Sequence, residues 1–194
     1  MAKRILIIQG HPDPTSSHFC HALSQAYTDA ARDAGHAVQH VEVATLDFPL
    51  LRSKHEWEQG DVPASLQPAQ QAILWSEHLV FFFPLWLGGM PALLKGFLEQ
   101  IARPGFALST ADEGRFPKKL LTGRSARLVV TMGMPALVYR WVFRAHSVKA
   151  LERNILGFVG IGPIHETLIG NIEGDAEART RWLARLRALG ESAE

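Results

Sequence analysis

A turn near the N-terminus combines histidines and hydroxyls in a spacing suited to binding an anion. The apolar residues 5–8 lead into the sequence GHPDPTSSHF, which holds His11, His18 and three consecutive hydroxyl side chains at residues 15–17. If a helix begins there, its free backbone N–H groups and the positive end of its dipole favour a phosphate. The same hydroxyls would also serve as ordinary helix caps, so the turn by itself leaves both interpretations open.

An aromatic loop with two glycines follows the most apolar run of the chain. Residues 79–83 read LVFFF, and the loop after Pro84 contains Trp86 together with Gly88 and Gly89. In an open α/β sheet, ligands bind beyond the carboxyl ends of the strands, so this loop is placed to lie against a flat aromatic ligand. A hydrophobic contact between two copies of the chain is the alternative. The run is shorter than the roughly 20 residues of a membrane span, so no membrane insertion is expected.

Hydrophobic periodicity predicts the elements that must position these residues. Short apolar or β-branched runs predict five strands, at residues 4–9, 37–43, 79–83, 126–131 and 163–169. Apolar residues at helical spacing predict helices over residues 19–35, 67–77, 91–103, 147–156 and 175–189. Such alternation indicates a single α/β domain over residues 1–194, with a flavodoxin-like, doubly wound five-stranded parallel sheet and helices on both faces. Residues 47–63 read as a polar loop, whose length suggests a function.

Composition argues against several classes of function. The formal net charge of +1 over 194 residues gives no reason to expect nucleic acid or an anionic membrane as a partner. The single cysteine, Cys20, cannot form an intrachain disulfide, and we expect a small buried side chain in a cytoplasmic protein. A GxGxxG fingerprint and a P-loop are both absent from the sequence. His36 and His40 flank the start of a strand instead of sharing a helix face, so no metal site is expected.

The aromatic loop and the helix after it resemble the flavodoxin-like NAD(P)H:quinone oxidoreductase family, which includes two-electron quinone reductases and potassium-efflux ancillary reductases. The shared pattern is a proline–hydrophobic–aromatic loop, here Pro84, Leu85, Trp86 and Leu87, followed by PALLKGF at residues 91–97. The resemblance implies that this loop wraps the ring system of a flavin, either FMN or FAD. It also implies that NAD(P)H donates a hydride and that a quinone or a similar planar molecule accepts it.

The resemblance assigns roles to residues at three strand ends. It implies that the phosphate and ribityl chain of the flavin are bound by His11, Ser17, His18 and Phe19. It also implies that the pyrimidine edge of the flavin is bound by Thr131, Met132 and Gly133. The candidate catalytic residues are Tyr139 and His146, of which the histidine would handle charge or protons during hydride transfer. Gly88 and Gly89 would leave one flavin face open to substrates. The tyrosines that the family often carries beyond the helix after the aromatic loop are missing from residues 106–110.

The leading hypothesis is a flavin-dependent NAD(P)H oxidoreductase that acts as a homodimer. In the resembling family the active site lies at a two-fold interface, and Met90, Trp141 and Phe143 offer apolar surface to such an interface. A flavodoxin-type electron carrier is one alternative, but such carriers are usually strongly acidic and this chain is nearly neutral. A regulatory flavoprotein that docks on a membrane transporter is the other alternative, which the sequence does not exclude.

Overall fold

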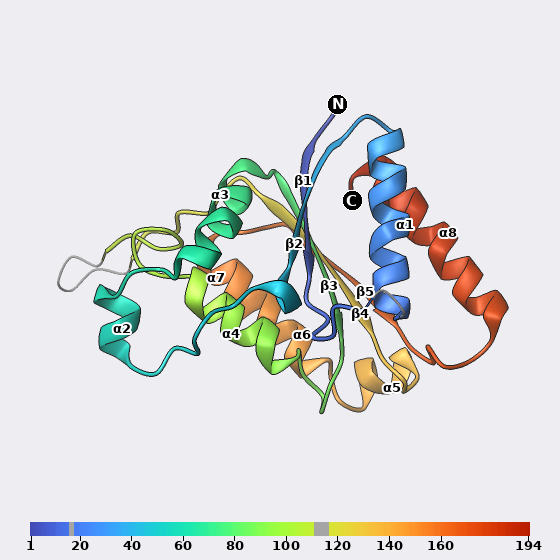
Figure 1. Cartoon of the computed structure of the whole chain (residues 1–194). Coiled ribbons are helices and arrows are strands. Elements are labelled where there is room, and N and C mark those ends of the chain that lie inside the picture. Colours follow the sequence, from blue (N-terminus) through green and yellow to red (C-terminus); the bar gives the residue numbers. More distant parts are fainter. Residues whose placement is uncertain (16–17, 111–116) are drawn as a thin grey trace.

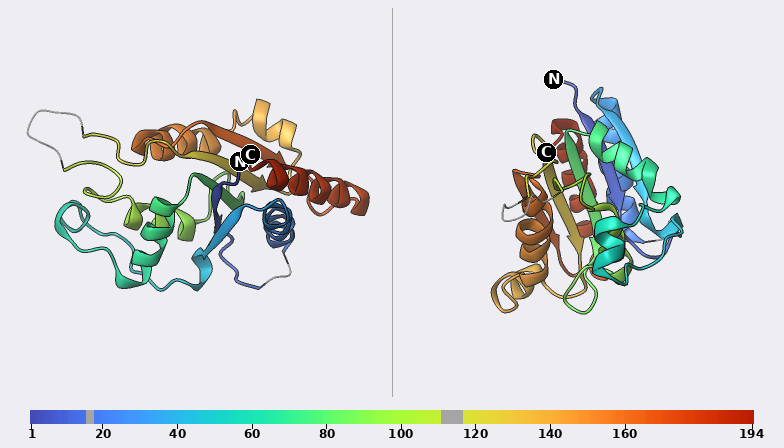
Figure 2. Two further views of the ribbon diagram at one scale, coloured as in Figure 1. Left: turned by 90° about the horizontal axis from the view of Figure 1, so that it is seen from above. Right: turned by 90° about the vertical axis from the view of Figure 1, so that its left-hand side faces the viewer.

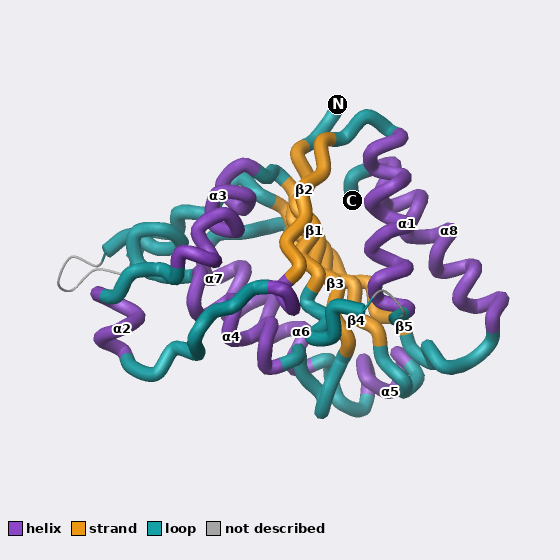
Figure 3. The backbone as a smooth tube through the Cα atoms, viewed as in Figure 1, coloured by secondary structure: helices purple, strands orange, loops and turns teal. Residues whose placement is uncertain are grey.

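The computed structural model describes residues 1–15, 18–110 and 117–194, and its centre is a five-stranded parallel sheet (Figures 1 and 3). The strands are β1 (Arg4–Gln9), β2 (Ala37–Glu42), β3 (His78–Pro84), β4 (Ser125–Thr131) and β5 (Ile164–Ile169). They lie in the order β2-β1-β3-β4-β5, and every neighbouring pair is parallel. This is the doubly wound sheet that the sequence predicts, and each strand agrees with its predicted range to within a residue at either end.

Helices cover both faces of the sheet. α1 (Phe19–Asp33) and α8 (Ala176–Ser192) pack side by side on one face, while α3 (Gln67–Trp75) and α4 (Ala92–Ile101) lie on the other (Figures 1 and 2). The second face is completed by α6 (His146–Ala150), the π-helix η3 (Leu151–Leu156) and α7 (Gly157–Val159), which follow one another without a break. The arrangement with helices on both faces is confirmed.

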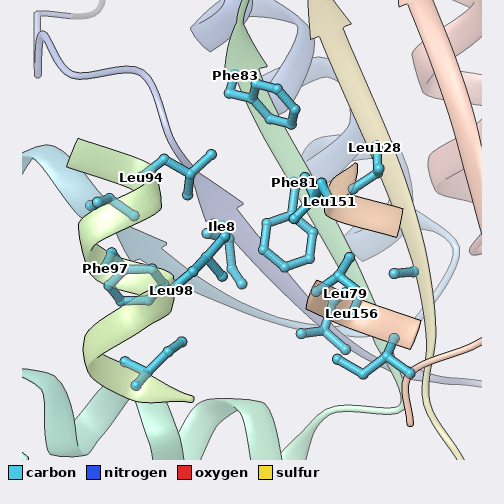
Figure 4. Close-up of a cluster of buried hydrophobic side chains, with 14 of the residues drawn as sticks. Ile8, Leu79, Phe81, Phe83, Leu94, Phe97, Leu98, Leu128, Leu151 and Leu156 are labelled. Atoms are coloured by element: carbon cyan, nitrogen blue, oxygen red, sulfur yellow. The ribbon is translucent and has the colours of Figure 1, made fainter. Parts of the chain in front are cut away.

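The central strand β3 is buried along its whole length and separates two parts of the core. Leu79, Phe81 and Phe83 belong to the apolar cluster under α3, α4 and η3 (Figure 4). Val80 and Phe82 belong to the cluster under α1 and α8. Successive side chains of a strand point to opposite faces, so a strand covered on both sides needs apolar residues at every position. This explains the unbroken LVFFF run.

The predicted polar loop over residues 47–63 contains a short helix, α2 (Lys54–Gln59), and it is flanked by the 3₁₀ turns η1 (Val43–Thr45) and η2 (Ala64–Leu66). Ser53 Oγ accepts a hydrogen bond from the Glu56 N–H at 3.0 Å, and Glu56 Oε2 accepts one from the Arg52 N–H at 3.0 Å. This reciprocal pattern is close to a capping box. The S-x-x-E signal stands at residues 53–56 of the sequence, so the helix was predictable.

Three further details differ from the predicted helices. The helical spacing of apolar residues predicts Ala22 on the buried face of α1, but Ala22 is exposed, whereas Tyr27 is fully buried. The last helix, α8, runs through Gly190 to Ser192 instead of ending before the glycine. A short helix, α5 (Ala136–Trp141), was not predicted. Within the described ranges, no helix combines the length and hydropathy needed to cross a membrane.

Candidate functional site

The loops that leave β1, β3 and β4 meet at one edge of the sheet. The Gly10 N–H donates to the Phe82 carbonyl at 2.7 Å, which ties the end of β1 to β3. The Leu85 N–H donates to the Thr131 carbonyl at 2.7 Å, which ties the loop after β3 to the end of β4. Parallel strands end at a common edge, and ligands of open α/β sheets bind there. The three segments singled out in the sequence therefore converge.

The aromatic loop is a tight two-residue turn. Trp86 and Gly89 exchange two backbone hydrogen bonds of 2.9 Å, with Leu87 at φ 48° and Gly88 at φ 78° between them. Positive φ at both central residues is the geometry of a type I′ turn, which glycine adopts without strain. Trp86 is 52% exposed, and its ring stands edge-on to the His11 ring at 6.1 Å. Trp86 therefore has an open ring surface beside the β1 loop.

His146 lies beside this turn. It is the exposed first residue of α6, and a Cβ built at Gly89 would lie 3.5 Å from Oγ of the adjacent Ser147. Two consecutive non-glycine residues before it, Arg144 at φ 55° and Ala145 at φ 49°, have left-handed backbone conformations. Each costs roughly 1–2 kcal/mol, and strain of this kind clusters at functional sites. The segments that carry Trp86, Gly88, Gly89 and His146 are therefore neighbours, and a pocket between them stays a prediction.

The third segment, Thr131 to Gly133, continues from β4 into the same edge. Thr131 and Met132 are buried, whereas Gly133 is exposed and a Cβ placed on it would have no atom within 4 Å. The backbone at Gly133 is therefore open to a ligand. Pro84 is the buried last residue of β3, and Leu85 packs against the core, so the exposed surface of the aromatic loop comes from Trp86, Leu87 and Gly88.

The side chain of Tyr139 is more deeply buried than we expect for a catalytic residue that contacts a substrate. Its side chain is 1% exposed, and its hydroxyl has no hydrogen-bond partner among the described residues. Burial raises the pKa of the phenol, and the nearby backbone of Val148 and Ser147 opposes that rise. A side chain at this depth touches a substrate only after a rearrangement, so direct catalysis by Tyr139 stays a prediction.

Three histidine rings lie close together at the β1–α1 turn. The His11 ring stacks on His18 with centroids 4.0 Å apart and planes inclined by 22°, and His21 lies 5.1 Å from His11 and 5.8 Å from His18. His18 precedes α1, and its Nε2 lies 2.8 Å from Asp13 Oδ2. His21, one helical turn after His18, was not singled out in the sequence, although its i, i+3 spacing places it on the same helix face.

Phe19 and Ser17 were also predicted to contact the phosphate and ribityl chain of the flavin, and both contacts stay predictions. Phe19 is the first residue of α1, is half-buried, and packs against the core cluster under α1 and α8. The Phe19 ring therefore packs toward the core, and only the Phe19 backbone lies at the start of α1. Ser17 lies outside the described residues.

An exposed apolar surface adjoins the pocket. It consists of Leu137, Trp141, Val142 and Phe143, which are 70%, 75%, 72% and 50% exposed. These residues belong to α5 and its C-terminal extension, next to the carboxyl ends of the strands (Figure 1). Met90, which was expected to share this surface, is half-buried and packs against the core instead.

A family model described as a flavodoxin-like fold matches residues 3–190. The chain belongs to this family. The resemblance inferred from the aromatic loop is thereby confirmed, and the flavodoxin-like sheet is the expected framework for the site.

Related proteins carry oxidoreductase names. A ribosyldihydronicotinamide dehydrogenase-like protein of Penicillium crustosum is 28% identical over 155 residues, which cover 67% of this chain but only 57% of that protein. An FMN-dependent NADH:quinone oxidoreductase of Listeria innocua is 24% identical over 204 residues, covering 96% and 95% of the two chains. The solved structure of an NAD(P)H:quinone oxidoreductase from Methanothermobacter marburgensis has a TM-score of 0.81 at 23% identity and full coverage of both chains.

The residues of this flavodoxin-like chain fit a flavin on two structural observations. Open space lies over Gly88 and Gly133, on the two loops that would hold the ring system. Both ring nitrogens of His21 are buried beside the turn that would hold the phosphate, and neither has a hydrogen-bond partner among the described residues. A buried polar atom without a partner costs free energy, so a ligand that satisfies it is favoured.

The electrostatics of the histidine cluster follow from burial and mutual repulsion. Burial lowers the pKa of His11 and of His21, and the neighbouring His18 lowers both further. The hydrogen bond from His18 lowers the pKa of Asp13 to about 2. Burial raises the pKa of Glu42, whose Oε1 lies 3.5 Å from His21 Nε2, and it raises the pKa of the Cys20 thiol to about 12. Despite these neighbours, the described residues contain no group of three or more such side chains arranged to hold a metal ion.

Proposed function

We propose that the protein is a flavin-dependent NAD(P)H oxidoreductase that reduces quinones or similar planar acceptors by two-electron hydride transfer. The observation that carries the proposal is the convergence of His11, the Trp86–Gly89 turn and Thr131–Gly133 at one sheet edge, through the Gly10–Phe82 and Leu85–Thr131 hydrogen bonds. The oxidoreductase names of relatives that align along nearly the whole chain support the same activity.

The chain's own residues supply position and electrostatics to this reaction. When bound, the flavin supplies the redox chemistry. Trp86 offers a flat apolar surface for a ring. The Met132 N–H already donates to the Ile169 carbonyl at 2.9 Å, so the exposed backbone of Gly133 is left to offer a fixed N–H donor where negative charge develops on reduction. Gly88 leaves open space on one side of the predicted pocket, and the missing side chain of Gly89 keeps the adjoining backbone clear, so donor and acceptor must use that space in turn. We therefore expect ping-pong kinetics.

The proposal is tested by reconstitution with flavin. Purified protein with excess FMN is expected to quench flavin fluorescence and to melt at a higher temperature, because a ligand that binds only the folded state stabilises it. NAD(P)H turnover with a simple benzoquinone then separates an enzyme from an electron carrier or a docking protein. Absence of both quenching and a thermal shift, for FMN and FAD alike, would reject flavin binding.

The variant His146→Ala is expected to lower the rate of turnover ~10-fold to ~100-fold while flavin remains bound. An imidazole beside the flavin can act as a general acid or base, which would balance charge on the reduced flavin or the leaving product. Stopped-flow absorbance resolves the reduction and reoxidation steps. His165→Ala, which removes an exposed histidine at the opposite end of the sheet on β5, is the matched control. Unchanged rates in His146→Ala would remove this residue from the mechanism.

We also propose that the protein is a cytoplasmic homodimer. The exposed apolar surface is a group of neighbouring side chains and not a single scattered residue: Leu137, Trp141, Val142 and Phe143. Contact with a second copy of the chain would remove this surface from water. Light scattering at micromolar concentration is expected to give twice the mass of one chain. A monomer mass would contradict the dimer without bearing on flavin binding.

A further inference from the structure

The segments that would surround a flavin phosphate lack permanent positive charge. Residues 5–31, 78–94 and 128–139, which include all three site loops, contain neither lysine nor arginine. Phosphate sites ordinarily use such side chains, because their charge offsets that of the ligand. At this turn the side chains able to become cationic are histidines: His11, His18 and His21.

These three rings share one small volume with two carboxylates. His11 follows β1, His18 is the residue before α1, His21 lies in the first turn of α1, and all centroid separations are 5.8 Å or less. Asp13 from the β1–α1 loop faces His18, and Glu42 at the end of β2 faces His21. Trp86, the neighbour of His11 from the loop after β3, carries no charge.

His21 is the member whose hydrogen-bonding capacity is unused. Its side chain is only 12% exposed, and neither ring nitrogen has a hydrogen-bond partner in the described structure. The same is true of Glu42 Oε1, which lies 3.5 Å from His21 Nε2. Protonation would convert this contact into a charge-assisted hydrogen bond. The ring can therefore accept a proton. Glu42 and Asp13 favour that proton, whereas burial and the neighbouring His18 lower the pKa of His21 while the phosphate is absent.

We propose that His21, with His11 and His18, is a proton-accepting receptor for the dianionic terminal phosphate of flavin mononucleotide, so that the chain takes up protons when it binds this ligand. The inference rests on the proposed function, because it concerns the same flavin site. A phosphate dianion beside the cluster supplies the negative charge that the imidazolium form lacks. The uptake also distinguishes flavins, because riboflavin has no phosphate and each phosphate of FAD, held by one ester and one anhydride bond, carries a single charge.

The sign of the pH dependence follows from proton linkage. In the free protein burial and mutual repulsion keep the pKa of His11 and of His21 below the ordinary value, and the dianion raises both. Affinity for FMN therefore increases as the pH falls through the raised values, by about 10-fold per pH unit for each proton taken up. The informative window is pH 6.5–8.5, because a phosphate monoester loses part of its own charge near its second pKa of about 6.

The experiment measures FMN and riboflavin binding to the full-length protein by fluorescence quenching at pH 6.5, 7.5 and 8.5. Calorimetry in two buffers of different ionisation enthalpy counts the protons taken up at pH 7.5. The wild-type protein is expected to bind FMN more weakly at each higher pH and to bind riboflavin with little dependence on pH. His21→Gln is expected to bind FMN ~10-fold more weakly at pH 6.5, with a flatter profile and smaller proton uptake.

Two further variants separate a role in proton uptake from a structural role. Glu42→Gln removes the carboxylate that faces His21 without touching the phosphate, and it is expected to reduce proton uptake. His40→Gln is the control, because His40 is an exposed histidine of β2 whose Nε2 lies 3.3 Å from Thr28 Oγ1. It is expected to bind FMN as the wild-type protein does.

The possible results are distinguishable. Wild-type proton uptake in both His21→Gln and Glu42→Gln overturns the inference, as does a riboflavin profile as steep as that of FMN. In either case flavin is still bound, so the proposed function stands. A wild-type protein that binds neither FMN nor riboflavin at any pH overturns both proposals together.

Discussion

Replacing Gly170 with alanine is expected to weaken FMN binding by about 10-fold or more. Gly170 follows β5, and a Cβ on it would lie 2.3 Å from the Ala136 nitrogen and 2.6 Å from the Met134 carbonyl oxygen. Both are backbone atoms, so no rotamer change relieves the contact, and the segment after Thr131 must move. Overpacking of this kind costs about 3 kcal/mol. Displacement of the predicted flavin-binding backbone by even part of an ångström would break short hydrogen bonds to the ligand.

The measurement for Gly170→Ala is the dissociation constant of FMN from fluorescence quenching, together with a thermal melt without ligand. The melt determines how much of the loss comes from general destabilisation. A matched variant with the same chemistry, Gly190→Ala, lies in the packing between α1 and α8, away from the strand ends that form the site. Equal FMN affinities for Gly170→Ala and the wild-type protein would show that the Thr131–Gly133 backbone does not hold the flavin.

Gly190→Ala is expected to lower the free energy of unfolding by about 3 kcal/mol. The added Cβ would lie 2.3 Å from the Tyr27 carbonyl oxygen and 3.2 Å from the Ala31 nitrogen, so α8 must shift away from α1. These two helices cover one face of the sheet, and Tyr27 and Leu186 are fully buried between or beneath them. The contact is again with backbone, so a change of rotamer does not remove it.

Urea denaturation followed by circular dichroism measures this loss directly. For a chain of this size a 3 kcal/mol loss corresponds to a fall in Tm of about 10 °C. FMN affinity below the melting temperature is expected to stay at the wild-type value, in contrast to Gly170→Ala. A Gly190→Ala protein as stable as the wild type would mean that the α1–α8 contact adjusts without cost.

Local sequence patterns determined the order and type of the main elements. The run at residues 79–83 predicts a strand covered on both faces because a sheet with helices on both sides leaves no position for a polar residue, and β3 has this environment. The proline–aromatic–glycine pattern after it predicts a ligand loop, and the structure forms a tight turn there. The sequence predicts that His11, Trp86 and Gly133 lie at the same edge of the sheet, because parallel strands end at one edge.

The structural roles of two glycines could not be predicted from the sequence. Gly190 reads as a helix terminator, since glycine commonly ends helices, yet α8 passes through it and uses the missing side chain to approach α1. Gly170 looks like an ordinary strand end, and its close approach to Met134 and Ala136 depends on a segment more than thirty residues earlier. Local sequence propensities do not describe contacts between segments that are distant in the sequence.

The sequence by itself determined that this chain is an α/β protein with a doubly wound sheet, and it identified the three loops of the candidate site. Only the tertiary structure decided that Tyr139 is buried, that the half-buried Phe19 packs against the core, and that His21 joins His11 and His18. The physical reason is that strand and helix periodicity are properties of neighbouring residues, whereas the burial and partners of a side chain depend on which distant segments pack against it.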